Sequence, residues 1–273
     1  MFSNWPATAR AQQNAMPVVG FVHLHSPELT REYLAAFHRG LSDAGFVGGK
    51  NLRVEYRWAE GRNDRLPTLI AELVDRPVSV LVVLESTLGA LAAKAATKSI
   101  PVVFMQGADP VRIGLVDTLS WPGGNLTGID LLLTAVAAKR LQLFRELLPM
   151  AKSVGYLRNP TDPTYAQSET GEVQAAAHAL GMELTPMNVS TIGELEGAFG
   201  NLEQQPVEAL FVSSDGFLLN HSGRILDLAA QHVLPAIYGW RQAVALGGLI
   251  SYGTNFFDAW RQAGAYTARI LKG

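Results

Sequence analysis

The feature that most constrains the fold is a pattern of short apolar, β-branched runs that alternate with longer amphipathic stretches. In the clearest unit, residues 18–22 predict a buried strand, and Leu34, Phe37 and Leu41 then recur at helical spacing until Gly45. Strands that are apolar throughout and are followed by helices with one apolar face are typical of parallel sheets covered by helices on both sides. The chain is therefore expected to be an α/β protein.

The same alternating pattern occurs in both halves of the chain. A stretch of helix and strand breakers at residues 121–125, Trp-Pro-Gly-Gly-Asn, separates the two halves, and a helix is expected from Ala135 to Leu148. We predict two doubly wound parallel-sheet lobes joined by a hinge, with residues 17–126 and 254–273 in the N-terminal lobe and residues 127–253 in the C-terminal lobe. The further strands are expected at residues 52–56, 80–84 and 101–105, and then at 154–157, 182–189, 209–212, 235–238 and 249–252.

Composition and the lack of catalytic motifs exclude several functional classes. The 273 residues are 48% hydrophobic, and 24 acidic against 22 basic side chains leave a net charge of −2, so no basic surface for nucleic acid is expected. Cysteine is absent, which excludes disulfides and thiolate metal sites, and no apolar run approaches a membrane span. The sequence has no P-loop, G-x-G-x-x-G, G-x-S-x-G or H-E-x-x-H motif. We therefore predict no catalytic residues, no cofactor and no metal, and a chain that binds a small molecule.

Residues 1–16 match no strand or helix pattern and are interpreted as a residual signal or leader segment. Ala9-Arg10-Ala11 has the small-x-small form that signal peptidase recognises, although a basic start and an apolar stretch are both lacking. Export to the periplasm is the interpretation we adopt, with the signal incomplete in this chain. The alternative is a disordered cytosolic leader that contains Ala-x-Ala by chance.

Candidate binding residues lie in the loops beyond the carboxyl ends of the strands, where open α/β sheets bind their ligands. Ser86 and Thr87 enter a helix, so hydroxyls and free N–H groups could hold an anionic group, or could merely cap the helix. Asp215 follows the strand at residues 209–212 and could pair with a ligand ammonium, or could be an N-cap or turn aspartate. Asp109, which precedes a proline, has the same two interpretations, and a turn is favoured there.

Histidine and aromatic residues supply the other candidates. His23 and His25 lie two residues apart on one face and could suit a metal, but no third ligand is near in sequence, so His25 and the adjacent Ser26 are expected to line the cleft. A closing cleft also needs flat apolar surfaces to enclose a ligand. The aromatic candidates, each of which could instead be a core residue, are Tyr165, Phe217, Trp240 and Tyr252.

A resemblance to a known family rests on six segments, residues 51–61, 101–104, 109–111, 122–128, 140–143 and 247–254. Together these segments resemble the bacterial ABC-transporter substrate-binding protein family, which includes tryptophan- and tyrosine-binding lipoproteins. The resemblance implies a type I periplasmic-binding fold and capture of a small molecule, an amino acid or an aromatic acid. It also implies delivery to a membrane permease driven by a separate ATPase, with contact to the membrane only through that permease. It implies that Ser86 and Thr87 hold a ligand carboxylate and that Asp215 faces the cleft from the other lobe.

Two other functions use the same architecture. A soluble α/β enzyme is one, because fold does not fix function, but the chain lacks a recognisable nucleophile and base. A ligand-sensing module for a membrane receptor is the other, and the sequence does not separate it from a transport protein.

Overall fold

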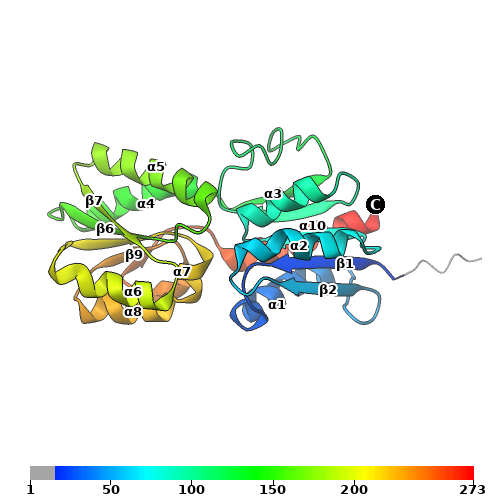
Figure 1. Cartoon of the computed structure of the whole chain (residues 1–273), viewed down its shortest axis with the longest axis horizontal. Coiled ribbons are helices and arrows are strands. Elements are labelled where there is room, and N and C mark those ends of the chain that lie inside the picture. Colours follow the sequence, from blue (N-terminus) through cyan, green and yellow to red (C-terminus); the bar gives the residue numbers. More distant parts are fainter. Residues whose placement is uncertain (1–15) are drawn as a thin grey trace, which may run out of the picture.

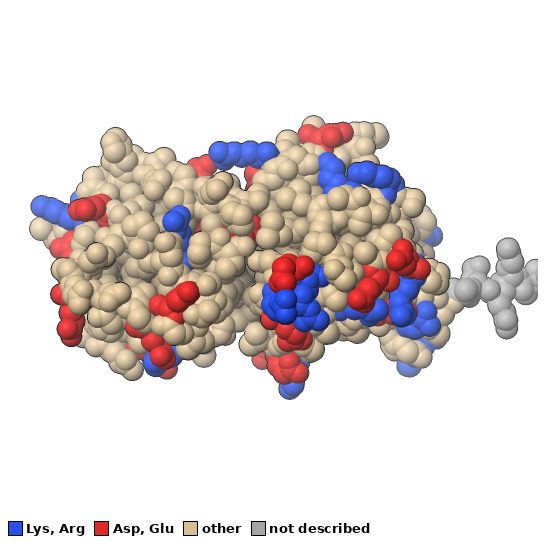
Figure 2. Space-filling model, viewed as in Figure 1, with Lys and Arg blue, Asp and Glu red and all other residues tan. Residues whose placement is uncertain are grey.

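The computed structural model describes residues 16–273 and contains two five-stranded sheets, each at the centre of one lobe (Figure 1). The candidate cleavage motif Ala9-Arg10-Ala11 lies outside the described residues. No helix within residues 16–273 combines the length and the apolar character that a membrane crossing requires. On the face shown in Figure 2, acidic and basic side chains are interspersed.

The first sheet has the strand order β2-β1-β3-β4-β5, and all of its strands are parallel. The residues of β1, β3 and β4 are buried, which is why these strands read as continuous apolar runs in the sequence. Its strands are β1 (Val18–His23), β2 (Arg53–Trp58), β3 (Val80–Leu84), β4 (Val102–Gln106) and β5 (Leu126–Asp130), and its helices are α1 (Pro27–Asp43), α2 (Leu66–Val74), α3 (Thr87–Ala96) and α10 (Phe256–Lys272), with a 3₁₀ turn at Asn63–Arg65.

The second sheet, read from its other edge, repeats this order as β7-β6-β8-β9-β10, again with parallel strands. The two halves of the chain therefore share one topology, and the prediction of two doubly wound parallel-sheet lobes is confirmed. The strands are β6 (Ser153–Arg158), β7 (Glu183–Asn188), β8 (Ala209–Val212), β9 (Ala236–Tyr238) and β10 (Ile250–Ser251), and the helices are α4 (Leu133–Leu147), α5 (Pro163–Ala179), α6 (Ile192–Gly200), α7 (Gly216–Asn220), α8 (Ser222–Gln231) and α9 (Arg241–Ala245), with a 3₁₀ turn at Asn201–Glu203.

The chain passes from the first lobe to the second after β5. Because β5 pairs with β4 from Leu126 to Asp130, its hydrogen bonds place residues 127–130 in the first sheet, whereas the sequence prediction began the second lobe at residue 127. The breakers at residues 121–125 belong to a surface loop that precedes this last strand. The chain returns between β10 and α10, where the Thr254 hydroxyl donates a hydrogen bond to the Leu131 carbonyl, so the two crossing segments touch.

Helix α10 closes the first lobe by packing against α1 at backbone distance. A Cβ atom added at Gly40 would overlap the Arg261 carbonyl, and one added at Gly264 would overlap the Phe37 carbonyl. Only glycine permits two helices to approach this closely at these two points. This contact fixes α10 to α1.

We expect Gly264→Ala to lower the free energy of unfolding by about 1–3 kcal/mol, because the added methyl group forces α10 away from α1. The matched control is Gly171→Ala in α5, where an added Cβ meets no atom within 4 Å. Helix propensity predicts a gain of about 0.5–1 kcal/mol for that control. Urea denaturation followed by circular dichroism measures both variants, and equal stabilities would contradict the role given to the α1–α10 contact.

Candidate functional site

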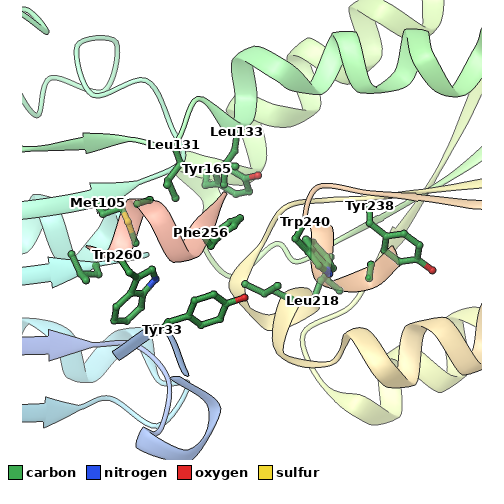
Figure 3. Packing of buried hydrophobic residues seen from close by; sticks show 14 of the residues in the cluster. Tyr33, Met105, Leu131, Leu133, Tyr165, Leu218, Tyr238, Trp240, Phe256 and Trp260 are labelled. Atoms are coloured by element: carbon green, nitrogen blue, oxygen red, sulfur yellow. The ribbon is translucent and has the colours of Figure 1, made fainter. Parts of the chain in front are cut away.

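A small cavity of about 40 Å³ lies between the lobes, at the carboxyl ends of strands from both sheets. This is the edge at which open parallel sheets bind ligands. Figure 3 shows Leu131, Leu133, Tyr165 and Phe256 close together where the two lobes meet. The residues that line the cavity are Glu85, Thr87, Gly107, Leu131, Leu133, Asp162, Tyr165, Ser214, Asp215, Gly216 and Phe256.

Asp215 both caps a helix and lines the cavity. It lies three residues beyond the end of β8, and its Oδ1 accepts hydrogen bonds from Phe217 N at 2.8 Å and from Asn159 Nδ2 at 3.1 Å. Burial raises the pKa of Asp215 to about 6, against the opposing effect of these hydrogen bonds, and the nearby Asp162 raises it further. The N-cap interpretation and the cleft-facing interpretation therefore both describe this residue.

Ser86 and Thr87 have different surroundings, although they are adjacent. Ser86 is the N-cap of α3, its Oγ accepts a hydrogen bond from Gly89 N at 2.9 Å, and it is not among the cavity-lining residues. Thr87 lines the cavity, and its hydroxyl lies 3.5 Å from Gln106 Oε1. Of this predicted pair, Thr87 is therefore the one in the cavity wall.

Asp162, which the sequence analysis missed, reaches this wall from the second lobe. It caps α5, where Tyr165 N donates to its Oδ1 at 3.1 Å. Burial raises the pKa of Asp162, and nearby polar groups, among them the Thr87 hydroxyl and Leu88 N of the other lobe, oppose that rise. The sequence Asp162-Pro163 is an ordinary helix-start signal, and it gives no indication that the side chain lies in the cavity wall.

Glu85 is a second carboxyl group that the sequence analysis did not select. Its φ of 57° lies in the left-handed region, which costs a non-glycine residue about 1–2 kcal/mol. Buried contacts hold it there, because its Oε1 accepts a hydrogen bond from Trp260 Nε1 at 2.6 Å and its Oε2 lies 3.6 Å from His23 Nε2. With Asp162 and Asp215 it gives the cavity three carboxyl groups, and no lysine or arginine is among the lining residues described.

A fully buried ion pair supports the cavity wall of the second lobe. Arg140 Nη2 lies 3.1 Å from Glu169 Oε1, and both side chains have 0% exposure. Glu169 also accepts hydrogen bonds from the hydroxyls of Tyr165 at 3.1 Å and Tyr156 at 2.9 Å, while Arg140 donates to the Ser214 hydroxyl. Tyr165 and Ser214 line the cavity, so this network holds two residues of the wall in position.

We expect Glu169→Gln to lower the free energy of unfolding by about 3–5 kcal/mol, because Arg140 would keep a buried charge without its partner. The control is Glu172→Gln on the same helix, where the carboxylate is exposed and lies 3.4 Å from Arg112 Nη1. An exposed pair contributes about 0–1 kcal/mol. Urea denaturation compares the two variants. A similar decrease in the free energy of unfolding in both would refute the stabilising role given to Glu169.

His25, Ser26 and Phe217 line a second, outer cavity of about 390 Å³ between the lobes. His25 is buried, and a Cβ added at Gly216 in the wall of the inner cavity would lie 2.7 Å from its Nε2, so the two cavities adjoin at this contact. Burial lowers the pKa of His25 to about 4, and the neighbouring His23 adds to this effect. The imidazole is therefore neutral at pH 7.

The other predicted residues lie outside both cavities. Trp240 is 1% exposed and packs on Tyr238 in the core (Figure 3), whereas Tyr252 is 40% exposed. Asp109 is exposed, and its Oδ1 accepts a hydrogen bond from Val111 N at 2.9 Å, which makes it a turn residue. The structure thus brings together Thr87, Tyr165 and Asp215 in the inner cavity, and His25, Ser26 and Phe217 in the outer one.

The histidine pair is not part of a larger ligand cluster. His23 Nδ1 accepts a hydrogen bond from His25 N at 3.1 Å. Within residues 16–273, no three histidine, cysteine or acidic side chains come together in a group that could hold a metal ion.

Comparison with known proteins agrees with this architecture. The "Tyrosine-binding protein" of Clostridioides difficile is 26% identical over 237 residues, which are 87% of this chain and 67% of that protein. A conserved domain protein from Vibrio cholerae superposes with a TM-score of 0.84 at 26% identity, over 94% of this chain and 86% of that one. An ABC domain from Streptococcus pneumonia in complex with L-Trp superposes with a TM-score of 0.81 at 22% identity, over 94% of this chain and 85% of that one. Residues 19–273 match the family described as ABC transporter substrate binding protein, and the chain belongs to that family.

Proposed function

We propose that this protein is the periplasmic solute-binding component of an ABC importer, and that it captures a small molecule carrying a protonated amino group. Amino acids are the first class to consider. The observation that carries the proposal is the acidic cavity between the two lobes, with Glu85, Asp162 and Asp215 in its wall and no basic side chain among the described lining residues. Its partners in this proposal are a membrane permease and a separate ATPase.

Asp215 is the residue best placed to receive the amino group. Its Oδ1 is engaged in capping α7, and its Oδ2 accepts none of the hydrogen bonds found among residues 16–273. An ammonium group at this oxygen would form a charge-assisted hydrogen bond, the strong class of such bonds. Tyr165 and Phe256 offer apolar surface in the same wall for the remainder of the ligand.

The same charges disfavour ligands whose only ionised group is a carboxylate. A solute-binding protein from Rhodopseudomonas palustris with the same fold holds benzoate, at 14% identity and a TM-score of 0.67 over 92% of this chain and 78% of that one. In the cavity described here, such an anion would meet three carboxyl groups and no lysine or arginine. Of amino acids and aromatic acids, the cavity chemistry therefore favours amino acids.

Entry of a ligand into the inner cavity requires the lobes to separate, because ligand pockets usually measure about 300–1,000 Å³ and this cavity measures about 40 Å³. The two crossing segments that meet at Leu131 and Thr254 are the only covalent links between the lobes within residues 16–273. We propose that closure about this point encloses the ligand, as in hinged binding proteins.

A thermal-shift screen of matched compounds tests the ligand class. L-tyrosine and L-tryptophan would be compared with 3-(4-hydroxyphenyl)propionate and indole-3-propionate, which lack the amino group, and with benzoate. We expect amino acids to stabilise the protein, by about 2.7 kcal/mol at one hundred times the dissociation constant, and the acids to have little effect. Stabilisation by the acids alone would refute the proposed ligand class.

We expect Asp215→Ala to weaken binding of the amino acid found in that screen at least tenfold, or about 1.4 kcal/mol. Isothermal titration calorimetry would measure the affinity, with Asp109→Ala, a turn residue outside both cavities, as the control. Because the pKa of Asp215 is raised to about 6, its carboxylate is lost below that pH, so wild-type affinity should fall as the pH decreases from 7 to 5. Unchanged affinity in Asp215→Ala would remove this residue from the site.

A further inference from the structure

The Glu85 carboxyl group has one oxygen that no described residue engages in a hydrogen bond. The side chain is 8% exposed and lines the inner cavity from the first lobe. Its Oε1 accepts the hydrogen bond from Trp260 Nε1, whereas its Oε2 accepts none of the hydrogen bonds found among residues 16–273. A carboxylate this deeply buried is costly unless a cation or further donors compensate its charge.

The neighbouring His23 does not supply that cation. Its Nδ1 accepts a hydrogen bond from His25 N, so this nitrogen carries no proton and the ring is neutral. Its buried Nε2 has no hydrogen-bond partner among the described residues and lies 3.6 Å from Glu85 Oε2, beyond the usual range of a hydrogen bond. Within residues 16–273, no lysine or arginine forms an ion pair with Glu85. The carboxylate therefore lacks a cationic partner in the described part of the chain.

The second lobe places a similar oxygen at the same cavity. Asp215 Oδ2 is likewise outside the hydrogen bonds found among residues 16–273, and Asp162 adds a third carboxyl group to the wall. A ligand that carries both an ammonium group and a carboxylate brings no net positive charge to balance these groups. An amine without a carboxylate brings one.

The wall also offers few side-chain donors to a ligand carboxylate. The Tyr165 hydroxyl donates into the buried ion-pair network behind the wall, and the cation of that network, Arg140, is fully buried. The Thr87 hydroxyl lies 3.5 Å from Gln106 Oε1. Among the hydroxyls of the described lining residues this leaves Ser214, which accepts a hydrogen bond from Arg140. The described side chains are therefore better suited to a cation than to an anion.

The size of the cavity agrees with a single cationic group. A volume of about 40 Å³ holds about three water-sized groups at about 10–15 Å³ each, and an ammonium group is of that size. An ammonium group and a carboxylate on one carbon atom need more room. In a space this small, a cation that bonds to one of the two free carboxyl oxygens also lies near the other.

We propose that Glu85 and Asp215, one from each lobe, bind the same ammonium group, and that the site selects ligands with a net positive charge. The substrate class is then primary amines and diamines, ahead of zwitterionic amino acids. An ammonium group has three N–H donors, enough for both carboxylates, and each of these hydrogen bonds is charge-assisted. This inference rests on the proposed function, because it assigns the amino group inferred there to a second residue.

Matched pairs of compounds that differ only by the carboxylate test the selection. Isothermal titration calorimetry of the wild type would compare tyramine with L-tyrosine, tryptamine with L-tryptophan, and cadaverine with L-lysine. In the pair that binds most tightly, we expect the amine to bind at least tenfold more tightly than the amino acid, a difference of about 1.4 kcal/mol.

The variant Glu85→Gln tests the residue itself. Glutamine keeps an oxygen that can accept the hydrogen bond from Trp260 Nε1 and removes only the negative charge. We expect the affinity for the amine to fall at least tenfold, because a charge-assisted hydrogen bond becomes a neutral one. The control is Glu72→Gln, whose exposed carboxylate pairs with Arg57 Nε at 2.7 Å outside both cavities, and its affinity should be unchanged. Circular dichroism of both variants checks that the fold is retained.

The outcomes separate this inference from the proposed function. Amines that bind no more tightly than their amino acids would overturn the selection for net positive charge, even where an ammonium group is required. Unchanged affinity for the amine in a folded Glu85→Gln variant would remove Glu85 from the site. The comparison in the wild type needs no variant, so it decides the ligand class even if Glu85→Gln does not fold. Stabilisation by the acids alone in the thermal-shift screen would instead refute the proposed function itself.

Discussion

Three partly buried carboxyl groups between two lobes, with no basic side chain among the described residues of their cavity, are the constraint on which the site depends. Buried carboxylates are costly unless hydrogen-bond donors compensate them. The fold supplies such donors, because every parallel strand ends at the same edge and the helix that follows begins there with free N–H groups. Asp162 and Asp215 each accept hydrogen bonds from such N–H groups, at the starts of α5 and α7. The topology thus makes an acidic cleft possible.

The lobes could be predicted from the sequence because burial on both faces leaves a local signature in each strand. The end of the first lobe was harder to locate. Helix and strand breakers mark a loop, but they do not indicate whether the strand after the loop belongs to the first or the second sheet. The Pro-Gly-Gly-Asn stretch precedes β5, and Asn125 Nδ2 donates to the Ile100 carbonyl at 2.7 Å, which anchors the loop beside the start of β4. Pairing between β4 and β5 is a long-range contact that no local pattern encodes.

The site was predicted less completely than the fold, for the same physical reason. Thr87 and Asp215 could be predicted because strand ends in this architecture face the cleft. Asp162 shows only the pattern of a helix start, and Glu85 matches no sequence pattern. Strand-end aromatics were equally uncertain, since one residue of displacement moves a side chain to the opposite face. Trp240 therefore lies in the core and Tyr252 in solvent, while Tyr165 reaches the cavity from a helix.

Charge and closure are coupled in this arrangement. Opening the cleft would return Asp215 to water and lower its raised pKa toward the ordinary value, whereas closing the cleft without a cation buries its carboxylate, beside Asp162 of the same lobe, at a cost. An ammonium group between the lobes would offset that cost in the closed state alone. The part of the binding free energy that depends on closure would then come from neutralising Asp215. A neutral ligand of the same shape would gain the apolar contacts but not this electrostatic contribution.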